Sequence, residues 1–295
     1  MRKSTSENRS QSKTISTKYF LLTTLPFLVM FMFAAADNSG SNTVPVRVDR
    51  WLEIQQMAGP VTLYRGQSSQ PARVGLRLQA VGDGIKTGSK AKVVLAADTG
   101  IGTISVSEQT SLRIQTLQVA PGNGRITRLQ VTGGQVRLKV RPFTNPGSRL
   151  EIQTPAGVSG VRGTEFGVSI QPDGKTGLAT LSGSVVSNAL GKAITVNGGF
   201  QNLVVAGEPP SPAVPLRNDT SLKIEIRKEI KGNVRWARLI GQIDFVNGLT
   251  IAGQPQVTDR NGRFDLTLPI ASQARVQAVV TTPLGKKQVY DLATW

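Results

Sequence analysis

Apolar and polar residues alternate with a period of two along most of the chain. In residues 136–140, "VRLKV", Val136, Leu138 and Val140 fall on one face and the two basic residues on the other. Residues 150–154 and 222–226 repeat the pattern. Since successive side chains of a strand point to opposite faces, this pattern predicts half-buried antiparallel strands.

Short glycine-rich turns separate the predicted strands. They lie at residues 82–84, 121–124, 132–134, 172–175 and 197–199. Strands therefore recur roughly every 8–12 residues, which is typical of all-β sandwiches, barrels and solenoids. Almost nothing beyond the N-terminal region has the period of a helix, so the predicted fold class is all-β.

A proline-rich break divides this pattern. Residues 208–220 contain four prolines, which predict an extended connector outside the regular ladders. A chain of 295 residues has the length of about two domains. We therefore expect a larger β-domain over residues 54–207, a Pro-rich linker at 208–220 and a small Ig-like β-sandwich at 221–295.

The first 36 residues have the three parts of a secretory signal peptide. A leader with five basic residues precedes the apolar stretch 19–33, and three alanines follow at 34–36. The apolar stretch is short for a membrane span, which needs about 20 residues, and it contains Pro26. We expect cleavage before Asp37 and a periplasmic or secreted protein; the alternative is an uncleaved anchor.

Composition removes several kinds of chemistry. The chain has no Cys and no His, which excludes thiol catalysis, Cys/His zinc sites and Ser-His-Asp triads. Its net charge is +17, and +13 remains once residues 1–36, with five basic residues and one acid, are removed. For an exported protein this charge favours an anionic envelope polymer over nucleic acid, or it reflects only solubility. No cofactor is expected.

Residues 154–168, "TPAGVSGVRGTEFGV", form the most distinctive stretch. A phosphate-binding loop needs a helix after its glycines, whereas a strand is predicted here. The spacing of Gly157, Gly160 and Gly163 instead predicts a tight corner. Arg162 is expected to fix this corner through an ion pair with Glu165 or through turn carbonyls; the alternative is contact with a partner.

This stretch resembles the signature of the FecR domain. The matching residues are Thr154, Pro155, Gly157, Val161, Arg162, Gly163, Thr164 and Phe166. Residues 80–96, "AVGDGIKTGSKAKVVLA", are similar to an upstream part of the same family. The resemblance extends over about residues 54–207, and it implies a FecR-type β-solenoid or sandwich domain that lies outside the inner membrane and has no catalysis of its own.

The resemblance suggests two functions. In iron-transport regulators such a domain relays a receptor's state to a cytoplasmic segment that binds a sigma factor. Only the short leader precedes the apolar stretch here, so we do not carry sigma-factor control over. We expect a non-enzymatic binding or scaffolding module at the cell envelope, whose partner is an envelope protein or an anionic cell-wall polysaccharide. The alternative is a periplasmic sensor that signals to a membrane partner, and membrane contact is expected only if the N-terminal segment stays uncleaved.

Three basic residues suggest where a polyanion could bind. Arg137, Lys139 and Arg141 alternate along one predicted strand and share a face. They would equally suit a solvated sheet face or an edge protected against aggregation. No aromatic residue interleaves with them, which argues against single-stranded nucleic acid.

A second charged motif lies near the C-terminus. Asp259, Asn261 and Asp265 have spacings that faintly resemble a calcium loop, but the closing Glu is missing. Asn261-Gly262 between alternating residues favours a hairpin turn. No metal site is expected, and nothing in the sequence selects a pair of carboxylates for hydrolysis.

Overall fold

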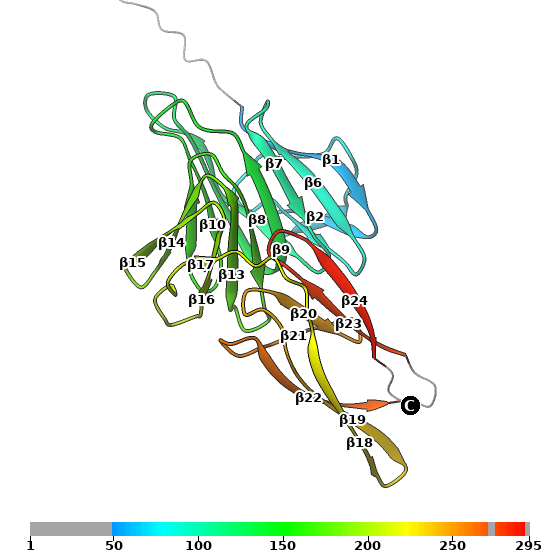
Figure 1. The fold of residues 1–295 in the computed structure, drawn as a ribbon. Helices are drawn as coiled ribbons and strands as arrows, with labels where there is room; N and C mark the ends of the chain where they lie inside the picture. Colours follow the sequence, from blue (N-terminus) through cyan, green and yellow to red (C-terminus); the bar gives the residue numbers. More distant parts are fainter. Residues whose placement is uncertain (1–48, 271–274, 293–295) are drawn as a thin grey trace, which may run out of the picture. The chain divides into compact units, whose positions relative to one another are not determined.

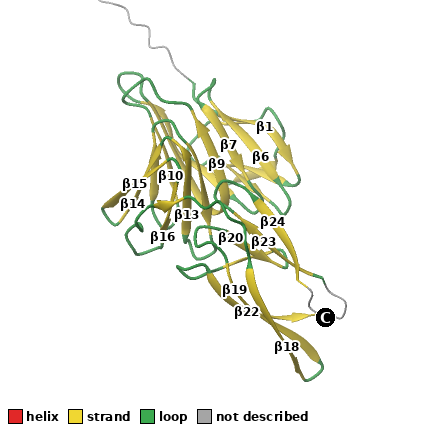
Figure 2. Ribbon diagram, in the orientation of Figure 1, coloured by secondary structure: helices red, strands yellow, loops and turns green. Residues whose placement is uncertain are grey.

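The computed structural model of the protein describes residues 49–270 and 275–292, and these residues form strands joined by loops and turns (Figure 2). The predicted all-β class is therefore confirmed. The predicted signal peptide lies outside the described residues. Within the described part of the chain, no helix is long and apolar enough to cross a membrane.

The larger N-terminal part consists of two layers of strands that share one long strand, β9 (Figure 1). Layer one has the strand order β4-β1-β6-β7-β9-β12-β13-β16-β17. Its members are β1 (Leu52–Ala58), β4 (Arg77–Leu78), β6 (Lys92–Ala97), β7 (Gly102–Val106), β9 (Arg125–Val140), β12 (Glu165–Ile170), β13 (Thr176–Ser182), β16 (Phe200–Val204) and β17 (Val214–Pro215).

Layer two has the order β3-β2-β5-β8-β9-β10-β11-β14-β15. Its pairs are antiparallel except for β9 with β10, which is parallel. Besides β9, its members are β2 (Val61–Arg65), β3 (Ser68–Pro71), β5 (Gly84–Thr87), β8 (Ser111–Val119), β10 (Arg149–Gln153), β11 (Val158–Val161), β14 (Ser184–Ala189) and β15 (Lys192–Asn197).

Strand β9 passes from one layer to the other at a pair of glycines. Its first half pairs with β8 and β10, and its second half, from Gly134, pairs with β12. Gly134 has a φ of +84°, and a Cβ atom there would lie 2.7 Å from the Cα atom of Thr110. Glycine alone adopts this conformation without strain in so narrow a space, so the turn signal at 132–134 marks a change of layer instead of the end of a strand.

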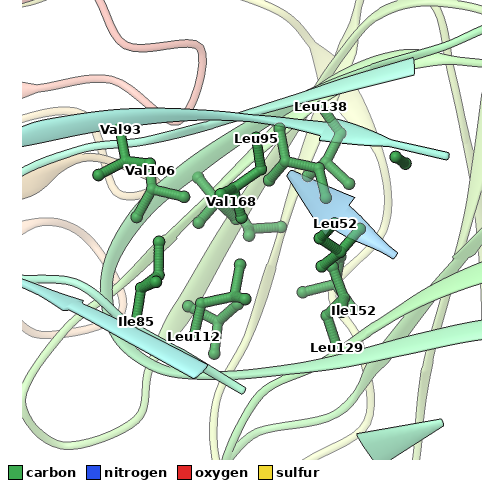
Figure 3. Packing of buried hydrophobic residues seen from close by; sticks show 14 of the residues in the cluster. Leu52, Ile85, Val93, Leu95, Val106, Leu112, Leu129, Leu138, Ile152 and Val168 are labelled. Carbon is green, nitrogen blue, oxygen red and sulfur yellow. The ribbon is translucent and has the colours of Figure 1, made fainter. Parts of the chain in front are cut away.

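The core of this part lies between the two layers. Figure 3 shows Val93, Leu95 and Val106 of layer one facing Ile85 and Leu112 of layer two. All five side chains are buried and belong to one apolar cluster. The alternating pattern thus folds as predicted, with one face of each layer turned inward and the other outward.

The C-terminal part is a small β-sandwich with its own apolar core. A three-stranded sheet, in the order β18-β19-β22, packs with a four-stranded sheet, in the order β21-β20-β23-β24. The strands are β18 (Lys223–Lys231), β19 (Val234–Gln242), β20 (Gly248–Ile251), β21 (Gln254–Gln256), β22 (Arg263–Ile270), β23 (Val276–Thr281) and β24 (Lys287–Leu292). Its Ig-like character and the domain boundaries stay predictions.

The proline-rich connector lies against the N-terminal part. Contrary to the expectation that its prolines keep it out of the ladders, Val214–Pro215 forms β17 at the edge of layer one, with Pro215 opposite Phe200. The backbone N–H of Ser211 also donates to the carbonyl oxygen of Leu203 at 2.8 Å. Proline is tolerated at an edge because no further strand needs its missing N–H.

Candidate functional site

The outward face of layer one is partly covered by the C-terminal sandwich. Residues 47–295 form one compact unit, and contacts between its two parts centre on β12 and β13. There the outward-facing residues are small: Gly167, Ser169, Gly177 and Ala179. Ser169 and Ala179 are buried although they face away from the core between the layers.

Two of these glycines make room for loops of the sandwich. A Cβ atom on Gly167 would overlap the carbonyl oxygen of Pro283, and one on Gly177 would overlap the carbonyl oxygen of Val246. A glycine inside a strand often marks such a close approach of another backbone. The two positions therefore bring the sandwich backbone directly onto layer one.

A buried polar network joins the two parts beside these glycines. The side-chain amide of Gln171 donates to the carbonyl oxygen of Asn247 at 2.9 Å and accepts from the backbone N–H of Thr258 at 2.8 Å. The ammonium of Lys175, which is 3% exposed, donates to the hydroxyl of Thr258 at 2.6 Å and to the carbonyl oxygen of Asp259 at 2.7 Å. Burial lowers the pKa of Lys175 to about 8, against the opposing charges of Asp173 and Asp259.

Lys175 should make the stability of the protein depend on pH. Its pKa is lower in the folded than in the unfolded chain, so the unfolded chain binds more protons between pH 8 and about 10.5. The free energy of unfolding should rise across this window, by roughly 2–3 kcal/mol from this group. Urea unfolding of wild type and Lys175→Met at a series of pH values isolates the effect, because all other titrating groups are common to both. Parallel pH profiles for the two proteins would refute the assignment.

An open pocket of about 480 Å³ lies where layer one meets the sandwich. Its lining comes from both parts and includes Lys90, Lys92, Gln135, Ser169, Thr250 and Lys287. The volume lies within the usual range for ligand sites. We call this pocket the junction groove; it combines exposed ammonium groups with amide and hydroxyl side chains.

Two contacts hold the floor and rim of the junction groove in place. Gln135 donates from its side-chain amide to the carbonyl oxygen of Pro283 at 2.6 Å and accepts from the hydroxyl of Ser107. Lys287 forms an ion pair with Glu108. Burial alone would raise the pKa of Glu108, but the hydrogen bonds from Lys287 and from the backbone N–H of Lys90 outweigh it and lower the pKa. Glu108 is therefore ionised at neutral pH, and the three lysines leave the groove with a positive balance.

The three basic residues predicted as a polyanion site, Arg137, Lys139 and Arg141, differ in burial and in contacts. Arg137 is half-buried, pairs with Glu165 and donates to the carbonyl oxygen of Leu284 at 3.3 Å. Lys139 and Arg141 remain exposed on the same strand and at its end, and Lys139 lies 3.9 Å from Glu165. Arg137 thus contacts the sandwich, and two of the three cations face solvent.

The FecR-like signature holds a crossing between the layers. The hydroxyl of Thr154 accepts a hydrogen bond from the backbone N–H of Gly157 at 3.3 Å. Val161 and Phe166 are buried in the core. Thr164 bonds the backbone of Val140 in both directions and donates its hydroxyl to Ser184. Pro155 is exposed beside the first turn.

Two expectations about this stretch need correction. The three glycines do not form a single corner: Gly157 closes the β10–β11 turn, Gly160 lies within β11, and Gly163 alone has a positive φ, of 133°. Of the two contacts expected for Arg162, the one to a turn carbonyl is present, since Arg162 donates to the carbonyl oxygen of Pro146. Glu165 pairs instead with Arg137 of β9. The ion pair between Arg162 and Glu165 was wrong because β12 pairs with β9 and so turns Glu165 toward Arg137 and Lys139.

The calcium-like spacing near the C-terminus belongs to a turn. The carboxylate of Asp259 accepts from the backbone N–H groups of Asn261 and Arg263, both at 2.8 Å, and Asp265 pairs with Arg238. The turn joins β21 to β22, which lie in different sheets, so it is not a hairpin. Among the described residues, no group of three or more acidic side chains could hold a metal ion.

Sequence reasoning missed the junction groove. Lys92 and Lys287 are 195 positions apart in the chain, and only the docking of the sandwich brings them to one pocket. The available signal was the pair of glycines at 167 and 177, inside β12 and β13. Glycines inside strands indicate that another backbone approaches closely, but they do not identify the approaching segment.

Residues 83–186 match the family model described as FecR protein. This match covers about a third of the chain and lies within the span expected from the sequence. The FecR-type resemblance is therefore confirmed over these residues. A search of curated proteins found no match.

Solved structures give weaker likenesses. Two crystal structures of a candidate anti-sigma factor from Parabacteroides distasonis ATCC 8503, at 2.50 and 1.65 Å resolution, each have a TM-score of 0.38 and 14% identity. Each comparison covers 45% of this chain and 59% of that one. A polysaccharide lyase has a TM-score of 0.19 and 11% identity, covering 82% of this chain and 39% of that one. With TM-scores this low, these likenesses carry no functional argument.

Proposed function

We propose that the protein is a non-enzymatic, exported binding module of the cell envelope that holds an anionic cell-wall polysaccharide in its junction groove. The observation that carries this proposal is the groove itself, with Lys90, Lys92 and Lys287 around hydroxyl and amide side chains. Ammonium groups attract carboxylates, and hydroxyl and amide groups hydrogen-bond sugar hydroxyls. Lys139 is also exposed on β9, but it does not line the groove and lies 3.9 Å from Glu165.

A binding role suits this site better than catalysis does. The chain has no His or Cys, and the acid that lines the groove, Glu108, is held as an ion-paired carboxylate. A glycosidase needs two carboxyl groups facing each other across the scissile bond. The groove therefore offers charge and hydrogen bonds, without an acid–base pair.

Binding to isolated cell-wall sacculi tests the proposal. The chain from Asp37 should co-sediment with sacculi at low salt and be released as salt rises, because exposed charges are screened. Lys90→Gln with Lys92→Gln should weaken binding roughly three- to tenfold, as two exposed ion pairs contribute about 0.2–1 kcal/mol each. Both lysines are exposed, so the fold should be unaffected.

The matched control removes the same charge elsewhere. Lys86→Gln with Lys192→Gln changes two exposed lysines on β5 and β15, outside the groove. It should bind sacculi as wild type does. Equal loss in both double variants would attribute the binding to net charge and overturn the assignment to the groove.

A second candidate function is relay of an envelope signal to a membrane partner. The match of residues 83–186 to the FecR family supports it, since the resemblance implies a periplasmic sensor. This alternative would be favoured if the protein did not bind sacculi at low salt but was cross-linked to one defined envelope protein.

A further inference from the structure

Strands β18 and β19 form a two-stranded ribbon that carries exposed aliphatic side chains at its tip. The strands pair from Lys223 opposite Gln242 to Lys231 opposite Val234, with Gly232-Asn233 as the two-residue turn. Gly232 has a φ of +62°, as the first turn position of a tight hairpin requires. Beside the turn, Ile230 is 67% exposed and Val234 is 44% exposed.

The third strand of this sheet stops short of the ribbon's tip. β22 pairs with β19 from Arg235 to Gln242. Ile230 lies opposite Arg235 and is therefore level with the last paired position of β22, whereas residues 231–234 extend beyond it. By their alternation, Ile230 and Val234 project from opposite faces of the ribbon. The tip therefore presents an aliphatic group on each side, which a single flat protein surface would not cover.

The charge of the ribbon is strongly positive. Between residues 223 and 238 there are six basic residues and two acids, a net charge of +4. Three of the six basic residues form ion pairs: Arg227 with Glu225, Lys231 with Glu229, and Arg238 with Asp265 of β22. With Asp265 included, the net charge is +3. Trp236 is half-buried on the same strand as Val234, two residues further from the tip.

We propose that the tip of the β18–β19 ribbon binds the surface of an anionic phospholipid bilayer. Basic side chains are attracted to such a surface, and aliphatic side chains are stabilised when they leave water for the headgroup–acyl boundary. Two aliphatic side chains on opposite faces of a narrow tip, followed by a tryptophan and surrounded by cations, suit shallow insertion. No lining residue of the junction groove belongs to β18 or β19, so this surface is separate from the proposed polysaccharide site.

Vesicle co-sedimentation tests the proposal. The chain from Asp37 contains the whole compact unit and lacks the basic leader that would itself bind lipid. It should partition onto vesicles of phosphatidylcholine with about one-third phosphatidylglycerol, with weaker binding at high salt and little binding to pure phosphatidylcholine. Ile230→Ser with Val234→Ser should reduce the partition coefficient about tenfold, because two aliphatic anchors are lost.

A matched variant controls for loss of exposed apolar surface. Val74 and Val81 are 60% and 69% exposed but lie in the loops on either side of β4, in the N-terminal part, so Val74→Ser with Val81→Ser should bind vesicles as wild type does. Equal binding by the ribbon variant and this control would overturn the proposal. So would equal binding of wild type to anionic and neutral vesicles.

A labelled tip gives a readout that does not depend on those variants. The chain has no Cys, so Asn233→Cys places a single environment-sensitive dye at the turn. Its emission should shift to the blue on anionic vesicles, whereas a dye on Gln67→Cys, at the exposed β2–β3 turn, should not shift. The same emission from both dyes on vesicles would refute insertion of the tip. If sacculi, and not vesicles, shift the Asn233→Cys dye, the ribbon binds polysaccharide and the lipid proposal fails.

Discussion

Methyl groups at positions 167 and 177 are expected to loosen the C-terminal sandwich from layer one. In Gly167→Ala with Gly177→Ala, each new Cβ atom meets a backbone carbonyl oxygen, of Pro283 and of Val246. Backbone cannot move aside as a side-chain end can, so each site should cost roughly 1–3 kcal/mol. Thermal unfolding should then change from one transition to two, with the sandwich melting first, and proteolysis should cut the connector at 208–220.

The control for this experiment is a third glycine in the same stretch of sequence. Gly160 lies in β11 without a positive φ, and a Cβ atom there would find only the Cγ atom of Glu151, at 4.0 Å. Gly160→Ala should therefore melt as wild type does or slightly higher. If the double variant also melts as wild type, the sandwich does not rest on these two glycines.

The same variant separates the two proposals of function. The junction groove needs both parts of the chain, so its binding of sacculi should fall when the sandwich detaches. The β18–β19 ribbon lies wholly within the sandwich, so its vesicle binding should persist. Loss of both activities would indicate that the sandwich itself unfolds once it leaves layer one.

Local pattern was sufficient to predict the strands but not the layers. Alternation in residues 136–140 predicts a strand, and the structure has it as the end of β9. That β9 is 16 residues long and changes layers at Gly134 depends on the space beside Thr110, which is 24 positions earlier. Contacts of this kind arise only when distant segments pack, so no local period reveals them.

The candidate site was less predictable than the fold for the same reason. Arg137 and Lys139 lie on β9 and Arg141 follows its last residue, but the sequence could not indicate that the backbone of Leu284 would contact Arg137. Lys175 belongs to the predicted turn "PDGK", and a lysine in a turn is usually exposed. Lys175 is buried because Thr258 and Asp259, more than 80 positions later in the chain, pack against it and accept its hydrogen bonds.

The second large effect is expected where the described chain begins. Arg50 is 7% exposed and donates to the carboxylate of Asp98 at 2.7 Å, and to backbone oxygens of Gln118 and Ile126. Asp98→Asn keeps the shape of the side chain and tolerates its φ of 44°, but it leaves the buried guanidinium without its counter-charge. The free energy of unfolding should fall by roughly 3–5 kcal/mol, measured by urea unfolding at neutral pH.

The loss in free energy of unfolding depends on how far the ion pair is exposed to solvent, and not on the ion pair alone. Arg77 and Glu53 form a pair of similar length, 2.6 Å, but their side chains are 46% and 30% exposed, so Glu53→Gln should cost less than about 1 kcal/mol. Adding Arg50→Met to Asp98→Asn removes the stranded charge and should restore part of the lost stability. Equal losses in Asp98→Asn and Glu53→Gln would mean that Arg50 reaches water, and that the start of β1 is held to β8 and β9 by its apolar contacts alone.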